Sequence, residues 1–446
     1  MRKAFLLALL LATPAFAADP AATIYSGVTL IDGTGAPPRE RMAIVVGDGH
    51  IEKIVPMTQL AALRAQANYK TAQIVDLHGD YALPGLIDSH VHLATDPDPA
   101  YERAILRRDI YSGVTTVRDM AGDTRVLSDL ARSTLLNKIE GPNIYYAALM
   151  AGPQFFHDPR TIAAAQGATP GAVPWMQAMT DDTDIPLAVA RAQGTGATAL
   201  KLYADMPAPL VTKITAEAHR QHMLVWVHAA IFPARPLEEA DAGVDVMSHA
   251  CMLAYQVSDA MPPEYHHRAS VQEEKFANGT APLDPLFAQM KSRGIILDAT
   301  LYVYDAMWRE RGTGPAPYCT LALAQKIAGA AHSAGIDIST GTDDDGDWHA
   351  LYPSLFDEIG LLVHTAGFTS LEAIRAATLI GARTVGREKE MGTLQTGKRA
   401  NMVFLAKNPL ADIANLRSVV LTVKDGAQYW RTKYQPITAD EAKSAQ

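Results

Sequence analysis

The stretch Pro84-Gly-Leu-Ile-Asp-Ser-His-Val-His-Leu93 contains the first indication of the fold. Its two histidines, His90 and His92, are two residues apart, and in a β-strand side chains at that spacing point to the same face. One His-x-His pair is weak evidence of a binding site, because half-buried strands often carry packed histidines. The rest of the chain has to decide what these two residues do.

Beyond this motif, short apolar strands alternate with helical stretches, which is typical of βαβ units and a parallel sheet. We expect eight strands, which end near His90, Asp119, Ala151, Lys201, His228, His249, Leu301 and Asp343. Eight strand–helix repeats in about 300 residues predict an α/β fold, a (β/α)8 TIM barrel, over residues 81–385. Within it, Thr369-Ser-Leu-Glu372 predicts a capping box at the start of a helix.

The two ends of the chain have a different pattern. Short β-rich runs separated by turns extend from Thr23 to Asp76, and similar runs return at residues 401–405 and 419–423. We therefore expect residues 18–80 and 386–446 to build one small composite β-sandwich beside the barrel.

The first 17 residues are typical of a secretory signal peptide. Arg2 and Lys3 precede an apolar run over residues 4–12, and Ala15-Phe16-Ala17 has the small-residue pattern of a cleavage site. This predicts a secreted or periplasmic protein. No later stretch approaches the roughly 20 apolar residues of a membrane helix, so we expect no stable membrane insertion after cleavage.

Charge and cysteine content limit the partners and the framework. Loss of Arg2 and Lys3 with the leader would change the formal charge from -9 to -11, which disfavours nucleic acid as a partner. Only Cys251 and Cys319 are present, too few for a disulfide framework, although one bridge between them is possible. We expect a small-molecule substrate and consider a homo-oligomer possible.

Four further chemically active residues lie at or just beyond the ends of different predicted strands. They are Lys201, His228, His249 and Asp343. Barrel enzymes place their active sites at this face, where the strands end. Four histidines, a lysine and an aspartate converging at one barrel mouth predict a metal site.

At these residues the sequence resembles the amidohydrolase superfamily, and within it the imidazolonepropionase-like and prolidase-like dipeptidases. The resemblance covers nearly the whole mature chain and includes Gly-Val-Thr-Thr-Val-Arg-Asp119, Gly341-Thr-Asp343 and Gly392-Thr-Leu-Gln-Thr-Gly-Lys-Arg-Ala400. It implies two divalent metal ions, zinc being our first expectation. His90, His92 and Asp343 would bind one ion, His228 and His249 the other, and Lys201, carboxylated to a carbamate, would bridge them.

The same resemblance implies a reaction. A hydroxide shared by the metals would attack an amide carbonyl in a dipeptide or N-acyl amino acid, and Asp343 would carry the proton to the leaving nitrogen. A lysine at the end of a buried strand favours the carbamate, because burial lowers its pKa and frees its amine. Imidazole and carboxylate ligands suit zinc, but manganese, iron and cobalt remain open.

The sequence departs from these dipeptidases where they bind substrate. Those relatives typically carry Gly-Gly-His, Glu-His-Gly and Pro-Thr-Leu segments after the third strand, after the sixth strand and in the seventh strand. Here the corresponding segments are Ala-Gly-Pro-Gln-Phe-Phe-His at 151–157, Ser-His-Ala at 248–250 and Asp-Ala-Thr-Leu at 298–301. His157, Tyr203 and Tyr302 are candidate substrate-binding residues, although each is also compatible with a loop or packing role. Asp344, Asp345 and Asp347 are compatible with a solvated charge run or with attraction of a substrate ammonium.

Two alternatives stay open. The same metal pair would also open lactones or phosphotriesters, because it activates water against any polarised carbonyl or phosphoryl centre. A non-catalytic periplasmic metal or solute carrier would need a missing ligand or proton acceptor, and the sequence has no such gap.

Overall fold

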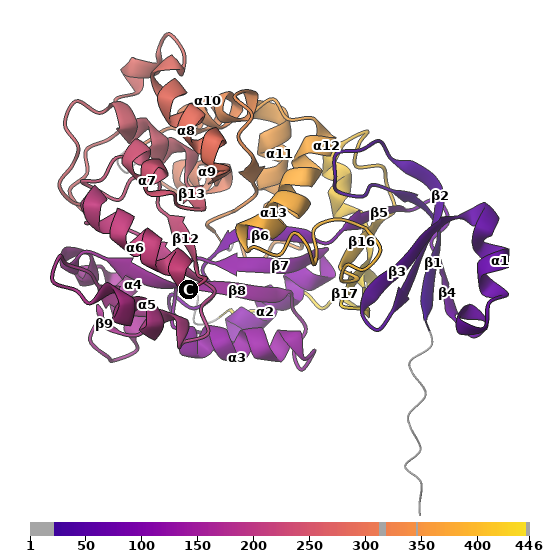
Figure 1. The fold of residues 1–446 in the computed structure, drawn as a ribbon. Helices are drawn as coiled ribbons and strands as arrows, with labels where there is room; N and C mark the ends of the chain where they lie inside the picture. The colour runs from indigo at the N-terminus through magenta and orange to yellow at the C-terminus, as the bar shows by residue number, and fades with distance from the viewer. Residues whose placement is uncertain (1–21, 312–317, 345–346, 443–446) are drawn as a thin grey trace, which may run out of the picture.

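The computed structural model describes residues 22–311, 318–344 and 347–442 (Figure 1). The predicted signal peptide, residues 1–17, lies outside the described residues. Among the described residues, no helix has both the length and the apolar character needed to cross a membrane.

Eight parallel strands form the predicted barrel, and this part of the expected fold is confirmed. They are β6 (Leu86–Val91), β7 (Val114–Asp119), β8 (Asn143–Ala151), β11 (Ala199–Leu202), β12 (Leu224–Val227), β13 (Val246–Ser248), β14 (Ile296–Asp298) and β15 (Ile338–Ser339). The barrel closes between its first and last strands, because the amide of Ser89 donates to the carbonyl of Thr340 at 2.7 Å. A short hairpin, β9 (Ala172–Val173) and β10 (Met176–Ala178), adds to β8.

Helices surround the barrel and connect successive strands (Figure 1). They are α2 (Pro99–Tyr111), α3 (Thr124–Leu135), α4 (Pro159–Ala165), α5 (Ile185–Gln193), α6 (Ala208–Arg220), α7 (Pro236–Ala242), α8 (Asp284–Arg293), α9 (Leu301–Glu310), α10 (Leu321–Ser333), α11 (Leu355–Thr365), α12 (Ser370–Arg375) and α13 (Gly381–Thr384). The predicted capping box at the start of α12 is confirmed, because Thr369 and Glu372 each accept a hydrogen bond from the other's amide, at 3.2 and 2.9 Å.

The barrel interior is filled in layers. Ala199, Trp226 and Ile296 belong to a buried apolar cluster supplied by several strands. Because side chains alternate along a strand, the residues two positions further on face the same interior, one layer nearer the carboxyl ends. Those residues are polar, namely Lys201, His228 and Asp298. The apolar layer therefore forms the floor beneath a layer of polar groups.

Two strands end earlier than the sequence predicts. β14 ends at Asp298 rather than near Leu301, because Thr300 adopts a left-handed conformation with φ 48° and α9 begins at the next residue. β15 ends at Ser339, four residues before Asp343. Its neighbour Thr340 still accepts the hydrogen bond that closes the barrel.

Both ends of the chain build a second sheet, as predicted. Its members are β1 (Thr23–Leu30), β2 (Arg39–Gly47), β3 (His50–Pro56), β4 (Gln73–Asp76), β5 (Tyr81–Pro84), β16 (Met402–Leu405), β17 (Val419–Lys424) and β18 (Ala427–Trp430). β5 pairs with β1 on one side and with β16 on the other, which joins the N-terminal and C-terminal strands. Apolar side chains of β2 and β3 share one core with those of β16 and β17. A short helix, α1 (Leu60–Arg64), packs on the other face.

Cys251 and Cys319 form a disulfide, the bridge that the sequence left open. It joins the segment that follows β13 to the residue pair before α10, and both cysteines are buried. Both segments lie on the side of the barrel where the strands end.

Candidate metal centre and substrate cavity

The six predicted metal ligands gather at the carboxyl end of the barrel. His90 lies in β6 and Lys201 in β11, while His228 and His249 directly follow β12 and β13. Asp343 comes from the segment after β15. His92 follows β6 by one residue. Ligands that are far apart in sequence therefore meet because parallel strands deliver their ends to one rim.

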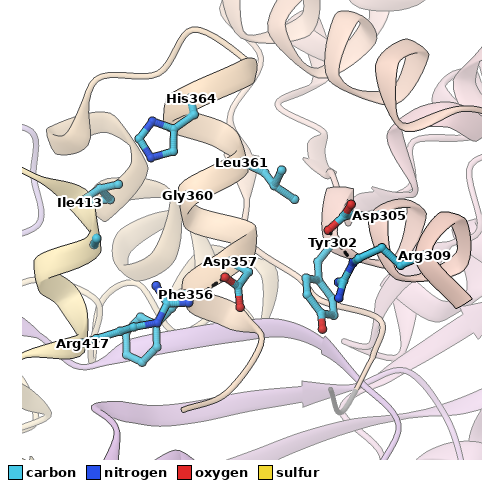
Figure 2. Close-up of a pocket in the computed structure, with 11 residues that line it drawn as sticks. Tyr302, Asp305, Arg309, Phe356, Asp357, Gly360, Leu361, His364, Ile413 and Arg417 are labelled. Carbon is cyan, nitrogen blue, oxygen red and sulfur yellow. Dashed lines mark hydrogen bonds and ion pairs between the residues drawn. The ribbon is translucent and has the colours of Figure 1, made fainter. Parts of the chain in front are cut away.

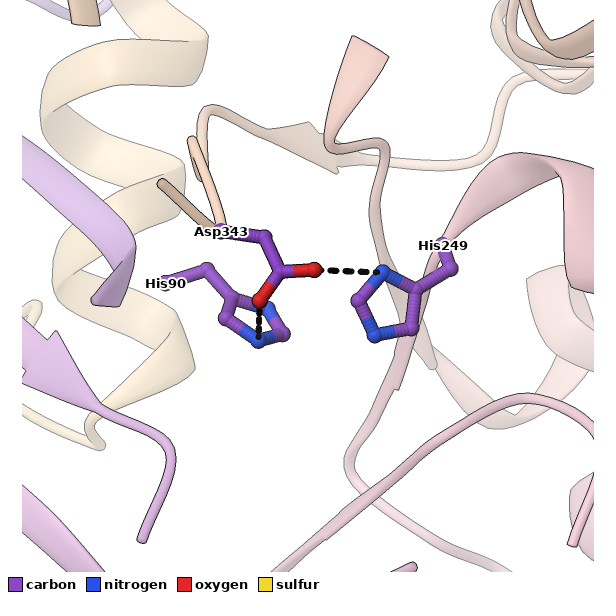
Figure 3. A group of neighbouring side chains, drawn as sticks. All are labelled: His90, His249 and Asp343. Atoms are coloured by element: carbon purple, nitrogen blue, oxygen red, sulfur yellow. Dashed lines mark ion pairs between the residues drawn. The ribbon is translucent and has the colours of Figure 1, made fainter. Parts of the chain in front are cut away.

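Asp343 is the meeting point of three histidines. Its Oδ1 lies 3.1 Å from Nε2 of His90, and its Oδ2 lies 3.7 Å from Nδ1 of His249 (Figure 3). The same Oδ1 lies 3.0 Å from Nε2 of His92. Donor atoms of His90, His249 and Asp343 all lie within 4.8 Å of one another. The ring centroids of His228 and His249 are 4.6 Å apart, so His228 extends the cluster.

The backbone at two of these residues is unusual. Asp343 has φ 55° and His249 has φ 77°, in the region that most non-glycine residues avoid. Such conformations persist when the surrounding structure holds them, and they are frequent at functional sites. Here they turn both side chains toward the same point.

The donor set suits divalent metal. The Nζ of Lys201 and Nδ1 of His228 are buried without a hydrogen-bond partner. Burial lowers the pKa of Lys201 to about 7, and the nearby charge of Arg118 acts in the same direction. Burial also lowers the pKa of His228 and His249 well below the usual range, so both imidazoles are neutral, the form that ligates metal.

Asp343 remains a carboxylate. Burial alone would raise the pKa of Asp343, but His90 and the hydrogen bond with His92 outweigh that effect and hold the pKa well below its usual range. Burial would lower the pKa of His92, yet its hydrogen bond to Asp343 raises it. One anionic oxygen donor thus faces an array of imidazoles, an arrangement suited to zinc or a similar transition metal.

Sequence reasoning missed Asp298, which supports the cluster from below. Its Oδ2 lies 2.8 Å from Nδ1 of His90, and Arg118 and Ser248 donate to the same oxygen at 2.8 and 3.0 Å. Burial would raise the pKa of Asp298, but the charge of Arg118 keeps it lowered. Metal-binding histidines commonly donate their second nitrogen to such a carboxylate. The sequence did contain an indication of this role. Asp298 comes two residues after Ile296 in the same strand, so its side chain faces the barrel interior as that of Ile296 does.

A cavity of about 390 Å³ opens above the cluster. Four of the predicted ligands line it: His92, His228, His249 and Asp343. Tyr203 also lines the cavity, and its ring lies between those of Phe155 and His228, with centroids 4.6 Å from each. Much of the remaining lining is apolar and includes Met120, Leu149, Met176, Val303 and Met307.

Two predicted substrate-binding residues lie elsewhere. His157 is exposed, its Nδ1 lies 3.1 Å from the carbonyl oxygen of Gln154, and it is not part of the cavity wall. Tyr302 lines a separate surface groove together with Arg309 and Arg417 (Figure 2). The reason is helix geometry, because at the start of α9 the side chains that face the cavity are Val303 and Met307, four residues apart.

The acidic loop after β15 contributes little to the cavity. Asp344 and Asp347 are absent from its wall, and Asp345 lies outside the described residues. The described residues of the loop, Asp344 and Asp347, therefore provide no partner for a substrate ammonium in this cavity.

Two arginines and two tyrosines in the cavity wall escaped the sequence analysis: Arg160, Arg268, Tyr265 and Tyr318. Arg160 forms two hydrogen bonds with Asp158 and donates to the hydroxyl of Tyr203 at 3.2 Å. All four lie in helices or long connections, where no strand periodicity indicates which way a side chain points.

Comparison with known proteins agrees with this geometry. The model of the amidohydrolase family matches residues 322–428. The ochratoxinase of Aspergillus niger is 26% identical over 440 residues, covering 87% of this chain and 82% of that protein. A putative prolidase from Bifidobacterium longum is 25% identical with a TM-score of 0.68, covering 95% of this chain and 98% of the other. A Xaa-Pro dipeptidase structure with bound methionine shares the fold, with a TM-score of 0.69 at 21% identity, covering 92% of this chain and all of that one.

The barrel, the ligand cluster at its rim and these similarities define the class as hydrolases that act on carbon–nitrogen bonds. The chain is similar to the amidohydrolase superfamily. Within that superfamily, its similarity is to the prolidase-like group.

Proposed function

We propose that the protein is an exported, metal-dependent amidohydrolase that cleaves the amide bond of a dipeptide or an N-acyl amino acid. One observation carries the proposal: histidines, a buried lysine and an ionised aspartate meet beside a cavity large enough for such a substrate. Pockets of roughly 300–1,000 Å³ are typical for small-molecule ligands.

The ligand roles follow from the cluster. His90, His92 and Asp343 would hold one divalent ion, His228 and His249 a second, and Lys201 as a carbamate would serve both. When bound, the metal supplies Lewis-acid polarisation of the carbonyl and activation of water at neutral pH. Zinc suits this set of nitrogen and oxygen donors.

Asp343 would also move a proton. Its carboxylate is ionised and lies at the cavity wall, so it can accept a proton from the attacking water and release it to the leaving nitrogen. Asp298 would act only through His90, by fixing the orientation of that imidazole. Tyr203 and Phe155 would form an aromatic wall for the substrate.

Export is the second part of the proposal. Residues 1–17 have the charge, apolar run and cleavage pattern of a signal peptide. The disulfide between Cys251 and Cys319 supports it, because such bonds persist in oxidising compartments. Expression of the full chain in a Gram-negative host should yield a periplasmic protein beginning near Ala18, while a variant without residues 1–17 should stay in the cytoplasm.

A substrate screen tests the catalytic proposal. Metal-loaded protein would be offered dipeptides, N-acyl amino acids, lactones and organophosphates, and products would be measured by mass spectrometry. We expect turnover of amides with apolar side chains, because the cavity wall is rich in methionine and aromatic residues. Turnover of lactones or organophosphates alone would assign the site to ester chemistry, and no turnover with metal fully bound would favour a carrier.

A further inference from the structure

The two arginines of the cavity wall differ in charge balance. Arg160 binds Asp158 through Nε and Nη2, at 3.0 and 2.7 Å to the two carboxylate oxygens, so its positive charge is already matched. Arg268 forms no ion pair with any residue in the described part of the chain. Its positive charge faces a partly enclosed cavity without a counter-charge.

The position of Arg268 is well defined by its surroundings. Its guanidinium carbon lies 4.0 Å from the ring centroid of Tyr265 and 4.5 Å from that of Tyr318. Its Nη1 donates to the carbonyl of Tyr265 at 3.0 Å, and its Nε is buried without a partner. The amide of Tyr265 in turn donates to Asp205 at 2.7 Å. Aromatic rings hold a guanidinium in place while its charge remains available.

Arg268 also lies close to the cluster of predicted metal ligands. Burial is the main cause of the lowered pKa of His228, and the charge of Arg268 acts in the same direction. Both Arg268 and His228 line the same cavity. An anionic group of a substrate held by Arg268 would therefore lie near its reacting amide.

We propose that Arg268 binds the free carboxylate of the leaving amino acid, so that the enzyme selects N-acyl amino acids. This rests on the proposed amidohydrolase function and specifies its substrate class. Arginine presents paired N–H donors that match the two oxygens of a carboxylate, and charge-assisted bonds of this kind are the strong ones.

The other charged residues of the cavity wall favour a substrate whose acyl group is uncharged. Within residues 22–311, 318–344 and 347–442, Asp343 is the one acidic residue in the cavity wall, and it is engaged by His90 and His92. The ammonium of an unblocked dipeptide would find no free carboxylate there to replace its hydration. An N-acyl group avoids that cost.

The wild-type enzyme provides the first test. N-acetyl-L-phenylalanine, its carboxamide and alanyl-L-phenylalanine share one side chain on the leaving half. The carboxamide lacks the negative charge of the carboxylate, and the dipeptide has an aminopropionyl group with an ammonium in place of the acetyl group. We expect the N-acetyl acid to have a kcat/KM about 10- to 100-fold above the other two, the range given by one charge-assisted hydrogen-bonded contact. The same comparison with leucine and methionine derivatives would cover other apolar side chains.

Substitution of Arg268 provides the second test. In Arg268→Gln, the preference for acid over carboxamide should fall to about one, chiefly through a higher KM for the acid, and Arg268→Lys should restore part of it. Arg309→Gln is the matched control. Arg309 is in α9 but lines the separate surface groove rather than the cavity, and it is paired with Asp305. Metal content and melting temperature should stay near wild type.

The possible failures are distinguishable. If no amide is cleaved by metal-loaded wild-type protein, the proposed function itself is wrong. If wild type cleaves amides but treats acid and carboxamide alike, or if Arg268→Gln retains the preference, the carboxylate role of Arg268 is wrong and the amidohydrolase function stands.

Discussion

Asp298 Oδ2 lies 2.8 Å from Nδ1 of His90, and this contact directs the other ring nitrogen of His90 toward Asp343 at 3.1 Å. A hydrogen bond from Nδ1–H to a carboxylate leaves Nε2 as the free lone pair. Asp298 thus sets both the orientation and the tautomer of His90. Arg118 donates to the same carboxylate oxygen, so the contact is part of a buried charged network.

Replacing Asp298 by Asn should weaken metal binding. We expect affinity to fall about 10- to 100-fold, as is typical when a carboxylate behind a metal-binding histidine is lost. Metal competition titration would measure it. The apoprotein should also lose about 3–5 kcal/mol in unfolding free energy, because Arg118 would remain buried without its counter-charge. The control is Asp337→Asn, which breaks ion pairs with Arg375 and Arg383 away from the site and should leave metal affinity unchanged.

Removal of metal should abolish activity. Without it, none of the described side chains provides an activated nucleophile for an amide at neutral pH. Elemental analysis should show about two ions per chain in active protein, and chelated protein should regain turnover when zinc is returned. Undiminished activity after complete demetallation would refute metal dependence.

Lys201→Ala should lose metal and activity together, because the carbamate on Lys201 is the one proposed ligand shared by both ions. Short carboxylic acids should restore part of the activity by occupying the vacated space. Lys424→Met is a matched control, since Lys424 is also buried but donates to the carbonyls of Thr134 and Gly141. That variant should lose stability and keep its metal. Normal turnover by Lys201→Ala would show that the lysine is structural.

Asp343→Asn separates metal binding from proton transfer. The amide retains an oxygen donor but cannot accept a proton, so kcat should fall by a factor of about 10²–10⁴ while KM changes little. Metal content should stay near wild type. Asp344→Asn is the neighbouring control, because Asp344 does not line the cavity. Equal kinetics for the two variants would contradict a proton-transfer role for Asp343.

The sequence alone determined the barrel, the terminal sheet and the convergence of the six predicted ligands. The reason is geometric: strand periodicity and the common direction of parallel strands place residues such as Lys201 and His228 at one rim, whatever the connections do. The same reasoning, applied to Asp298 with the strand end placed three residues earlier, would have included it.

Tertiary structure alone decided the environment of those ligands. Asp298 reaches His90 across 208 residues of sequence, and Arg268 reaches the cavity from a connection without regular periodicity. His157 and Tyr302 lie outside the cavity wall because both belong to helical segments, Pro153–His157 and α9, where helix rotation decides which side chain faces inward. Strand ends follow a local rule of alternation, whereas the walls of the cavity depend on how long connections pack against one another.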